Sequence, residues 1–327
     1  MTHFHENIAV LLLFFVVHLL IGAALMARTR GRPWLWTIME SAAGDAARRL
    51  NRGGRSDSDR IVRGAVVFVV FLLLAYGAGS LWALMSRSNW GWAADLFLLS
   101  GAMTAMAPVA VMRGVGRRLA DQKTNQARDI LARHLREDLT QADAHMLARK
   151  AVEYGIESLC VLLVGPALAF ALFGAVGVFV YVMVMAQHRI YGHIVPAQLH
   201  FGATVRAAER LVNLLPAVVT SLLVVTGAAV VSRGKPAMAA TLAVQQAGRD
   251  DSLNRGMVLA AAAGGLGLAL GGPRRWADGQ VRPAAWLGAA AETARTEPAA
   301  VRQAGLLAFV AFLLFALGFS MAFMMRI

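Results

Sequence analysis

The sequence has a single cysteine, Cys160, and few charged side chains for its length. One cysteine excludes an intrachain disulfide and a metal cluster built on thiolates. Cys160 lies inside an apolar run, where we expect it to act as a small buried hydrophobic residue rather than a nucleophile. Only 16% of the 327 residues are charged and 58% are hydrophobic, whereas about 25% are charged in soluble domains. This scarcity of charge argues against a soluble globular protein and predicts an integral membrane protein.

Acidic residues and lysine are also scarce. The chain has 19 acidic residues against 32 basic ones, which gives a formal net charge of +13, and 29 of the basic residues are arginine. These charges flank apolar runs, and no zinc-finger or RNA-binding motif accompanies them, so we expect no nucleic-acid partner. Anionic membrane lipids explain the basic excess, and a phosphorylated or carboxylated substrate is the alternative.

Several apolar runs approach or exceed the roughly 20 residues that a helix needs to cross a bilayer. They are 8–26, 64–85, 96–111, 306–325 and, as a further span, 211–231. Together with the apolar region 156–187, they predict an all-α, polytopic membrane helical bundle with about five or six membrane segments. We treat residues 1–327 as a single membrane domain.

The arginines predict the orientation of this bundle. Residues 27–63 hold nine Arg against four acids, and residues 113–150 hold nine Arg or Lys against five acids, whereas 86–94 holds Arg87 alone. Cytoplasmic loops keep an excess of basic residues, so both long loops, 27–63 and 113–152, are expected in the cytoplasm. The N-terminus is then expected outside, in a bacterial inner membrane. The first run has no preceding positive region and is interpreted as a retained helix rather than a secretory signal.

The loop 113–152 has the pattern of an amphipathic helix pair. Its apolar residues recur mostly three to five positions apart, at Ile130, Leu131, Leu135, Leu139, Met146, Leu147 and Val152,. Thr140 followed by Asp143 predicts a capping-box-like start for the second helix.

The run 156–187 carries no charge except Glu157, and one straight helix of its length would exceed the thickness of a membrane,. Gly165-Pro166 and Gly174–Gly177 are candidate breaking points, so we predict a broken or hairpin path. Glu153 and Glu157 stand one helical turn apart before the run. They could bind a divalent cation, accept protons, or form an ordinary pair at a helix end. His188 and His193 follow the run with a spacing that suits a shared metal poorly.

The segment 252–272 is the most informative stretch of the chain. Ser252 and Asn254 stand at its start, and a run rich in glycine and alanine follows. A simple membrane anchor needs neither, so we interpret it as a packed, site-lining segment that spans, re-enters or lies buried in protein. Gly264-Gly265-Leu-Gly267 is interpreted as tight helix packing rather than a nucleotide loop. We expect 273–302 to be a loop with a short helix.

Taken in order along the chain, these and other short motifs resemble the adenosylcobinamide-phosphate synthase family of cobalamin biosynthesis (CobD/CbiB). The matching motifs are 152–158 (Val-Glu-Tyr-Gly-Ile-Glu-Ser), Gly165-Pro166, Gly192-His193, Phe201-Gly202, 213–216 (Asn-Leu-Leu-Pro), 252–256 (Ser-Leu-Asn-Arg-Gly), Ala263-Gly264 and 270–272 (Leu-Gly-Gly). The serial order of these motifs, rather than any single one, carries the resemblance over nearly the whole chain.

The resemblance implies a membrane enzyme that joins adenosylcobyric acid to an aminopropanol phosphate, using ATP and Mg²⁺ to activate a carboxylate. It implies catalytic roles for Glu153, Glu157 and Asn254, with Glu153 and Glu157 as the metal ligands. It implies substrate-binding roles for Ser158, His188, His193, Asn213, Ser252, Gly256, Gly271 and Gly272. The corrinoid is then the small-molecule partner.

The chain departs from the family pattern mainly at polar positions, which indicates a divergent member. Departures include Ser158 for Asn, Val161 for Asp, 185–190 without its Asn and Asp, Glu209-Arg210 for paired aspartates, Val218 for Arg, and His18 and Ala23 for acids. Glycine and proline set backbone geometry, whereas carboxylates and amides bind ligands. Whether the chain is an enzyme therefore stays open.

Two other functions are compatible with the sequence. The first is a non-catalytic relative of the same fold, similar to AmpE-type inner-membrane sensor or signalling proteins, with a protein partner or as a homo-oligomer. The C-terminal run 306–325 and the lost acids favour it, while Asn254, Gly256 and Gly271-Gly272 oppose it. The second is a transporter with a midplane site in 156–187, which the lack of an inverted repeat disfavours.

Overall fold

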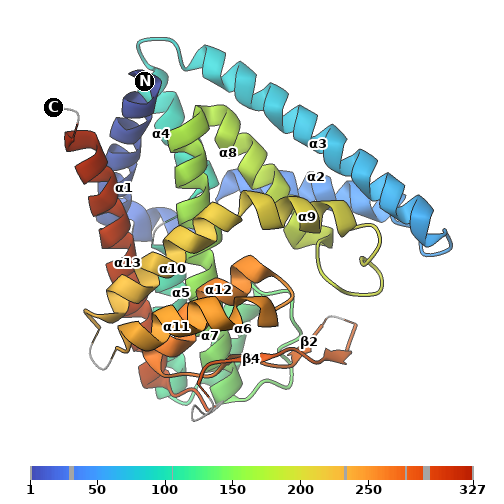
Figure 1. The fold of residues 1–327 in the computed structure, drawn as a ribbon, viewed down its shortest axis with the longest axis vertical. Coiled ribbons are helices and arrows are strands. Elements are labelled where there is room, and N and C mark those ends of the chain that lie inside the picture. The colour runs from blue at the N-terminus through green and yellow to red at the C-terminus, as the bar shows by residue number, and fades with distance from the viewer. Residues whose placement is uncertain are drawn as a thin grey trace. The chain divides into compact units, whose positions relative to one another are not determined.

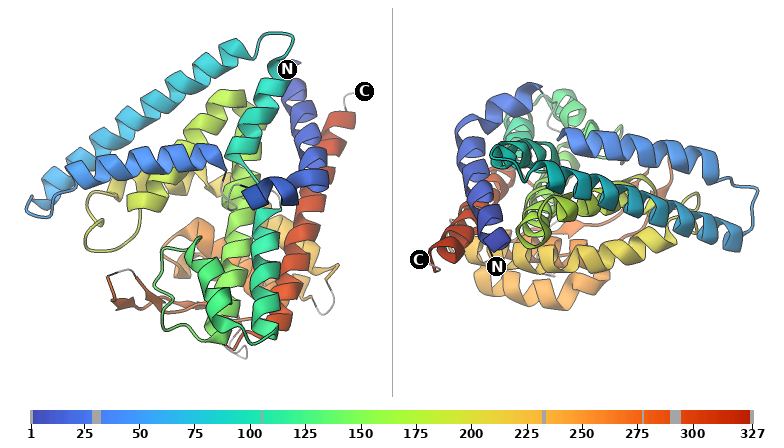
Figure 2. Two further views of the ribbon diagram at one scale, coloured as in Figure 1. Left: turned by 180° about the vertical axis from the view of Figure 1, so that it is seen from behind. Right: turned by 90° about the horizontal axis from the view of Figure 1, so that it is seen from above.

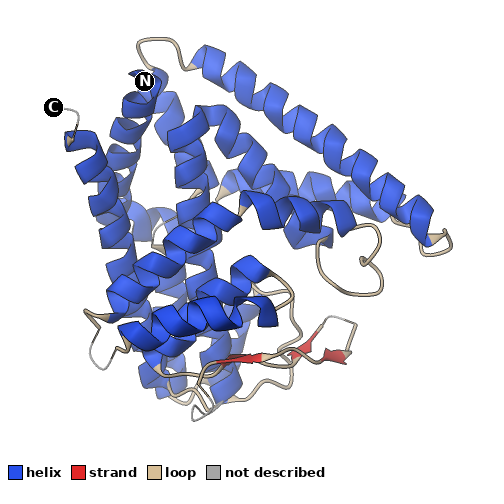
Figure 3. Cartoon of the chain, in the orientation of Figure 1, coloured by secondary structure: helices blue, strands red, loops and turns tan. Residues whose placement is uncertain are grey.

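The computed structural model describes residues 2–28, 33–104, 106–231, 234–276, 278–289 and 295–325, most of which are helical (Figure 3). The α-helices are α1 (Thr2–Arg28), α2 (Trp34–Leu50), α3 (Asp57–Met85), α4 (Gly91–Ala102), α5 (Ala107–Ala120), α6 (Thr124–Ala132), α7 (Ala144–Leu159), α8 (Gly165–Tyr191), α9 (Ala203–Val212), α10 (Leu214–Ala228), α11 (Pro236–Gln246), α12 (Leu253–Leu266) and α13 (Pro298–Met324). A π-helical turn (Cys160–Val164), a 3-10 turn (Ala247–Arg249) and the two-residue strands β1 (Leu270–Gly271), β2 (Arg274–Arg275), β3 (Val281–Arg282) and β4 (Trp286–Leu287) complete the described elements (Figure 1).

The chain folds into two compact units. Unit 1 contains Met1–Thr104, Val161–Pro216 and Phe319–Ile327, and unit 2 contains Ala105–Cys160 and Ala217–Gly318. Each unit is therefore built from stretches that are far apart in the sequence. The expectation of one domain stays a prediction.

Among the described residues, four helical segments are long and apolar enough to cross a membrane. They are Asp57–Met85, Gly91–Ala120, Ala144–Tyr191 and Pro298–Met324, and the bent pair α9 and α10 makes a fifth if it counts as one span. The helix axes of that pair differ by 50°. The prediction of an all-α, polytopic membrane bundle is confirmed, and the expected runs at 64–85, 96–111 and 306–325 all lie within these segments.

Helix α3 shows how such a segment meets lipid. Ser56 caps its N-terminus by accepting a hydrogen bond from the Asp59 backbone N–H at 3.3 Å,. Large apolar side chains on this helix are exposed, among them Leu73, Leu74 and Leu81. Soluble proteins rarely expose many large apolar side chains together on one helix. The exposed face of α3 therefore fits a hydrocarbon environment.

The opposite face of α3 packs against α8 within unit 1, and Figure 2 shows the two helices from two further directions. A Cβ atom added at Gly79 would lie 2.7 Å from the Val176 Cα. Only glycine permits so close an approach of the two backbones, as is common between membrane helices.

The apolar run 156–187 is interrupted at two points. The π-helical turn Cys160–Val164 directly precedes Gly165-Pro166. Gly174 then has φ 60° and ψ −148°, a conformation that only glycine adopts readily, and α8 bends there,. Within unit 1, an added Cβ at Gly165 would lie 1.9 Å from the Tyr181 Oη. Sixteen residues of straight helix would separate these positions by roughly 24 Å, so the two arms of α8 fold back on each other.

The predicted helix pair in 113–152 forms, although its second helix begins differently from the prediction. Asp143, not Thr140, caps α7, because its side chain accepts from the Met146 N–H at 2.7 Å,. Thr140 instead donates from its hydroxyl and its backbone N–H to Asp138, at 2.7 and 2.9 Å. The shorter side chain of aspartate at position 143 suits the N-cap itself better than the third helical position.

Helix α12 contains most of the glycine- and alanine-rich segment and is buried among protein. It is 14 residues long and is not one of the candidate spans. Added Cβ atoms would lie 2.1 Å from the Ala247 carbonyl oxygen at Gly256 and 2.6 Å from that of Met238 at Gly264. The interpretation of Gly264 as a position of tight helix packing is therefore confirmed, with α11 and α12 side by side, whereas Gly267 ends α12 with φ 66°.

In the expected loop 273–302, the described residues before α13 form no helix, and residues 277 and 290–294 of this segment lie outside the described residues. Residues 274–287 contain strands, with β2 paired to β3 and β1 paired to β4, both antiparallel. Gly279, with φ 76°, lies between β2 and β3. The Gly, Pro and Arg residues of this segment follow no helical period. Its backbone N–H and C=O groups instead form hydrogen bonds between short antiparallel strands,.

Candidate functional site

Helix α7 in unit 2 places three charged side chains along one face. Lys150, Glu153 and Glu157 stand three and four positions apart, the spacing that brings side chains to the same side of a helix,. Lys150 and Glu153 are almost fully buried, at 1% and 2% exposure, whereas 42% of the Glu157 side chain is exposed. The face therefore runs from buried charge to a carboxylate that solvent can reach.

The ammonium group of Lys150 lies between two carboxylates. Its Nζ is 2.8 Å from the Glu137 Oε2 and donates to the Glu153 Oε2 at 3.0 Å. Burying a charge is costly unless it is paired. These contacts therefore explain how a lysine persists in the interior of the unit.

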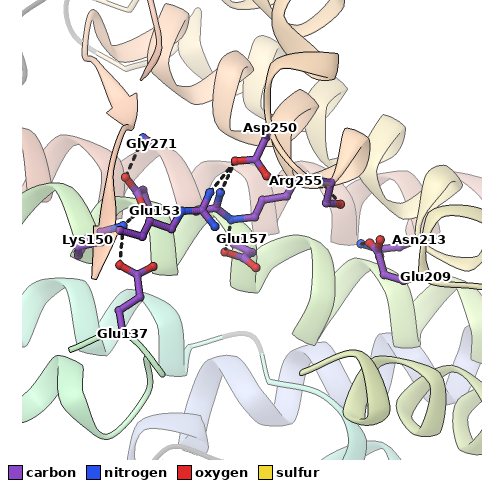
Figure 4. A network of polar contacts seen from close by, with 11 residues as sticks. Glu137, Lys150, Glu153, Glu157, Glu209, Asn213, Asp250, Arg255 and Gly271 are labelled. Carbon is purple, nitrogen blue, oxygen red and sulfur yellow. Dashed lines mark hydrogen bonds and ion pairs between the residues drawn. The ribbon is translucent and has the colours of Figure 1, made fainter. Parts of the chain in front are cut away.

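Arg255 lies in α12, in the stretch Ala217–Gly318 of unit 2, and its side chain contacts this face of α7, as Figure 4 shows. It donates from Nε to Glu157 at 3.1 Å, from Nη2 to Glu153 at 3.3 Å and from Nη1 to Asp250 at 2.6 Å. Burial alone would lower the pKa of the Arg255 guanidinium, but Glu157, Asp250, Glu153 and Glu137 together hold that pKa above its ordinary value,. Arg255 is thus permanently charged.

Two more groups complete the arrangement. Asp250 also accepts from the Arg274 Nη2 at 2.6 Å, and the Gly271 backbone N–H donates to the Glu153 Oε1 at 2.8 Å. Gly271 has φ 79°, and an added Cβ would lie 2.6 Å from the Ala285 carbonyl oxygen. Glycine is therefore required at the position whose backbone binds Glu153.

Arg149 approaches the same carboxylate from α7. Its Nε is 3.8 Å from the Glu153 Oε1, and its guanidinium carbon is 4.7 Å from the centre of the Trp286 ring,. An added Cβ at Gly272 would lie 2.5 Å from this tryptophan ring. Gly272 thus helps to place the ring on which Arg149 rests.

We call the charged residues just described the Arg255 network. Its members are Glu137, Arg149, Lys150, Glu153, Glu157, Asp250, Arg255 and Arg274. Four carboxylates and four cations meet in it, so its formal charge is balanced.

The structure brings several of the predicted site residues to this network. Ser252 caps α12 by accepting from the Arg255 N–H at 3.4 Å, and Asn254 is 1% exposed beside it. Gly256 packs against the Ala247 backbone. Ser158, the neighbour of Glu157, is buried at 5% exposure. The motifs around Glu157 and Asn254 are therefore close in space, because Arg255 donates a hydrogen bond to Glu157, which is 98 positions away in the sequence.

The remaining predicted residues lie in unit 1. The rings of His188 and His193 are 6.0 Å apart at the end of α8, and the His193 Nε2 is 3.1 Å from the Arg189 carbonyl oxygen. Asn213 accepts from the Tyr181 hydroxyl at 3.0 Å and donates to the Glu209 Oε1 at 3.2 Å. These two groups form their own clusters within that unit.

The residues around Glu153 do not fit a magnesium ion. Mg²⁺ needs oxygen ligands at about 2.1 Å in near-octahedral geometry, but the Glu153 oxygens are bound by Lys150, Arg255 and the Gly271 N–H. Among the described residues, no group of three or more His, Cys, Asp or Glu is placed to hold a metal ion. These contacts of Glu153 do not fit the role of metal ligand that the resemblance implied for it, and the same role for Glu157 stays a prediction.

The sequence patterns did not point to Glu137, Lys150, Asp250, Arg255 or Arg274 as members of this site, although Arg255 lies inside the matching motif 252–256. A usable signal existed, because an arginine within an apolar, glycine-rich segment needs a buried counter-ion. Lys150 offered a similar signal as one of only three lysines in the chain.

The fold and the site define a multi-pass helical membrane protein with a buried, charge-balanced network that one half-exposed carboxylate connects to solvent. The chain belongs to the CobD/CbiB family, because the family model described as CobD/Cbib protein matches residues 19–323.

Curated relatives agree with this assignment. A protein of Sinorhizobium sp named cobalamin biosynthesis protein CobD is 29% identical over 266 residues, covering 77% of this chain and 81% of that protein. A protein of the same name from Rhizobium meliloti is 29% identical over 282 residues, covering 79% and 83%. One from Mycobacterium tuberculosis is 32% identical over 192 residues, covering 56% and 61%. No solved structure matches the chain.

Proposed function

We propose that this chain acts in cobalamin biosynthesis, as an enzyme that forms an amide bond on a corrinoid carboxylate. Family membership over residues 19–323 and the names of the relatives support the pathway. The resemblance further implies adenosylcobyric acid and an aminopropanol phosphate as substrates and ATP as the activating co-substrate. The AmpE-like alternative has no comparable support.

One observation carries the proposal toward catalysis: Glu157 is the half-exposed carboxylate of an otherwise buried network. Amide formation requires the amine to attack the activated carboxyl carbon, so that a C–N bond forms while the bond to the leaving group breaks. The amine must lose a proton in this step. In the proposed mechanism the Glu157 carboxylate takes that proton, and Arg255, 3.1 Å away, orients it.

Glu153 and Asn254 have supporting roles in this mechanism. Glu153 is buried and bound by three donors, so it fixes Arg255 and is a positioning residue rather than a proton acceptor. Asn254, buried at the start of α12, contributes to the position of its neighbour Arg255. Because magnesium does not fit at Glu153, no step is assigned to a metal there.

Genetic complementation tests the proposal. The unmutated chain is expected to restore cobalamin synthesis to a bacterial strain that lacks its own synthase, and Glu157→Gln is expected to abolish that growth. Glu297→Gln is the matched control, because Glu297 is 66% exposed and pairs only loosely with His145 at 3.7 Å. Glu297→Gln should complement like the unmutated chain.

Failure of the unmutated chain to complement, despite its presence in the membrane, would contradict the enzymatic proposal. A protein partner that co-purifies with the chain, together with absent corrinoid binding, would then favour the sensor function. The placement of the loops 27–63 and 113–152 in the cytoplasm, and of the chain in the inner membrane, stays a prediction. In a Cys160→Ser background, labelling of a single cysteine introduced at Gly53, or at Ser88 on the expected outer side, would test the orientation.

A further inference from the structure

We infer that the guanidinium of Arg255 occupies the place that a divalent cation would need between Glu153, Glu157 and Asp250. The chain then carries a fixed internal cation at this point and binds no metal there. This inference stands on the contacts of Arg255 and does not depend on which reaction the chain performs.

The geometry of the contacts is the first argument. Each of the three guanidinium nitrogens donates to a different carboxylate: Nη2 to Glu153, Nε to Glu157 and Nη1 to Asp250, at 3.3, 3.1 and 2.6 Å. Guanidinium is a planar fork whose donors point outward in its own plane. The group therefore fills the space on which the carboxylates converge, as Figure 4 shows.

The charge of the carboxylates is the second argument. The Glu153 and Asp250 side chains are each 3% exposed, and buried carboxylates so close together need a cation,. Proteins meet this need with a basic side chain or with a metal ion. Lys150 contacts Glu153 and Arg274 contacts Asp250, but Arg255 is the cation that contacts both of these carboxylates and Glu157. Its charge is permanent, because a guanidinium in a protein does not lose its proton.

The position of Arg255 on its helix is the third argument. Ser252 is the N-cap of α12, so Arg255 stands at the third helical position, where its own N–H binds the Ser252 hydroxyl. The positive end of the helix dipole disfavours a cation here, and a glutamate or glutamine is the usual residue. Helix stability does not explain this arginine, whereas the three carboxylates around it do.

The experiment is a Mn²⁺ titration of the purified full chain in detergent, followed by the electron paramagnetic resonance signal of free Mn²⁺. The unmutated chain and Glu157→Gln should bind equal amounts of Mn²⁺. Arg255→Ala should bind one additional Mn²⁺ per chain, and adding Glu157→Gln to that variant should remove it. Arg255→Lys, which keeps a cation, and Arg48→Ala, which removes an exposed arginine, should gain none.

Thermal unfolding gives a second readout if Arg255→Ala folds poorly. Mn²⁺ should raise the midpoint of thermal unfolding for Arg255→Ala, but not for the unmutated chain or the double variant. Two results would overturn the inference. One is a Mn²⁺ site in the unmutated chain that Glu157→Gln removes, and the other is an Arg255→Ala variant that shows neither additional Mn²⁺ nor a raised midpoint. Neither readout uses enzyme activity, so failed complementation would not affect the result.

Discussion

The two units each contain a buried polar cluster, and the clusters are built in opposite ways. In unit 2, the Arg255 network joins α7 to α12 and to strand β1 through pairs that are 98 to 118 positions apart in the sequence. In unit 1, Asn213 is hydrogen-bonded to Tyr181 and to Glu209, and we call these three residues the Asn213 cluster. Glu209 and Asn213 are one helical turn apart, and a neutral hydroxyl supplies the third group.

The two clusters differ in the charge of their members and in the sequence separation of their partners. This difference predicts that substitutions in the two clusters will lower the free energy of unfolding by different amounts. Removing one partner of a buried ion pair leaves its counterpart charged, buried and unpaired, which costs far more than the pair itself contributes. Removing one neutral hydrogen bond costs about 1 kcal/mol. The Arg255 network should therefore tolerate substitution poorly, whereas the Asn213 cluster should tolerate it well.

The largest effect is expected at Lys150. Lys150→Met keeps the length and apolar stem of the side chain but leaves Glu137 and Glu153 without their shared cation. We expect a loss of about 3–5 kcal/mol in the free energy of unfolding, as for other broken buried pairs. The midpoint of unfolding in detergent, by heat or denaturant, measures this loss.

Lys123→Met is the matched control, because it makes the same chemical change at an exposed position. It should change the free energy of unfolding by less than about 0.5 kcal/mol. Equal effects of the two substitutions would mean that the buried network adds nothing to stability, and the comparison between the units would fail.

The next largest loss of stability is expected at Gly271, whose backbone N–H donates a hydrogen bond to Glu153 in the network. Gly271→Ala would place a Cβ 2.6 Å from the Ala285 carbonyl oxygen at φ 79°, and would displace the N–H that binds Glu153. The φ angle alone costs about 1–2 kcal/mol, and overpacking adds about 1–3 kcal/mol. Denaturant unfolding measures the total.

Gly279→Ala separates these two contributions. Gly279 has nearly the same φ, 76°, but nothing lies within 4 Å of an added Cβ. It should therefore show only the cost of the φ angle. If Gly271→Ala were no more destabilising than Gly279→Ala, the contact between β1 and Glu153 would not constrain the fold.

Most of the helical architecture could be predicted from the sequence, because it depends on local patterns. The apolar runs 64–85, 96–111 and 306–325 lie in candidate spans, whereas the run 8–26 is represented among the described residues only by the shorter apolar helix His5–Leu20. Gly174 falls within the breaking point proposed at Gly174–Gly177. The strands near Gly279 could not be predicted, since two-residue strands leave no period to detect. The exchange of roles between Thr140 and Asp143 was missed because both residues cap helices well and only their spacing to the helix start distinguishes them.

The candidate site was predictable only in part, for a different reason. Glu153 and Glu157 were found because one helical turn separates them. Their true partner, Arg255, is about 100 positions away, and no local rule connects them. Without that partner, two carboxylates on one helix face are compatible with a cation site, with proton acceptance and with an ordinary helix-end pair, and the sequence could not choose among these alternatives.

The smallest effect is expected in the Asn213 cluster. Tyr181→Phe removes the hydroxyl that donates to the Asn213 Oδ1 at 3.0 Å but keeps the ring beside Gly165. We expect a loss of about 1 kcal/mol in the free energy of unfolding, because Asn213 keeps its bond to Glu209,. Tyr76→Phe, at a position 59% exposed, is the matched control and should be neutral. A loss at Tyr181 as large as that of Lys150→Met would show that one neutral hydrogen bond constrains unit 1 as strongly as a buried ion pair constrains unit 2, and charge would then not explain the difference between the two clusters.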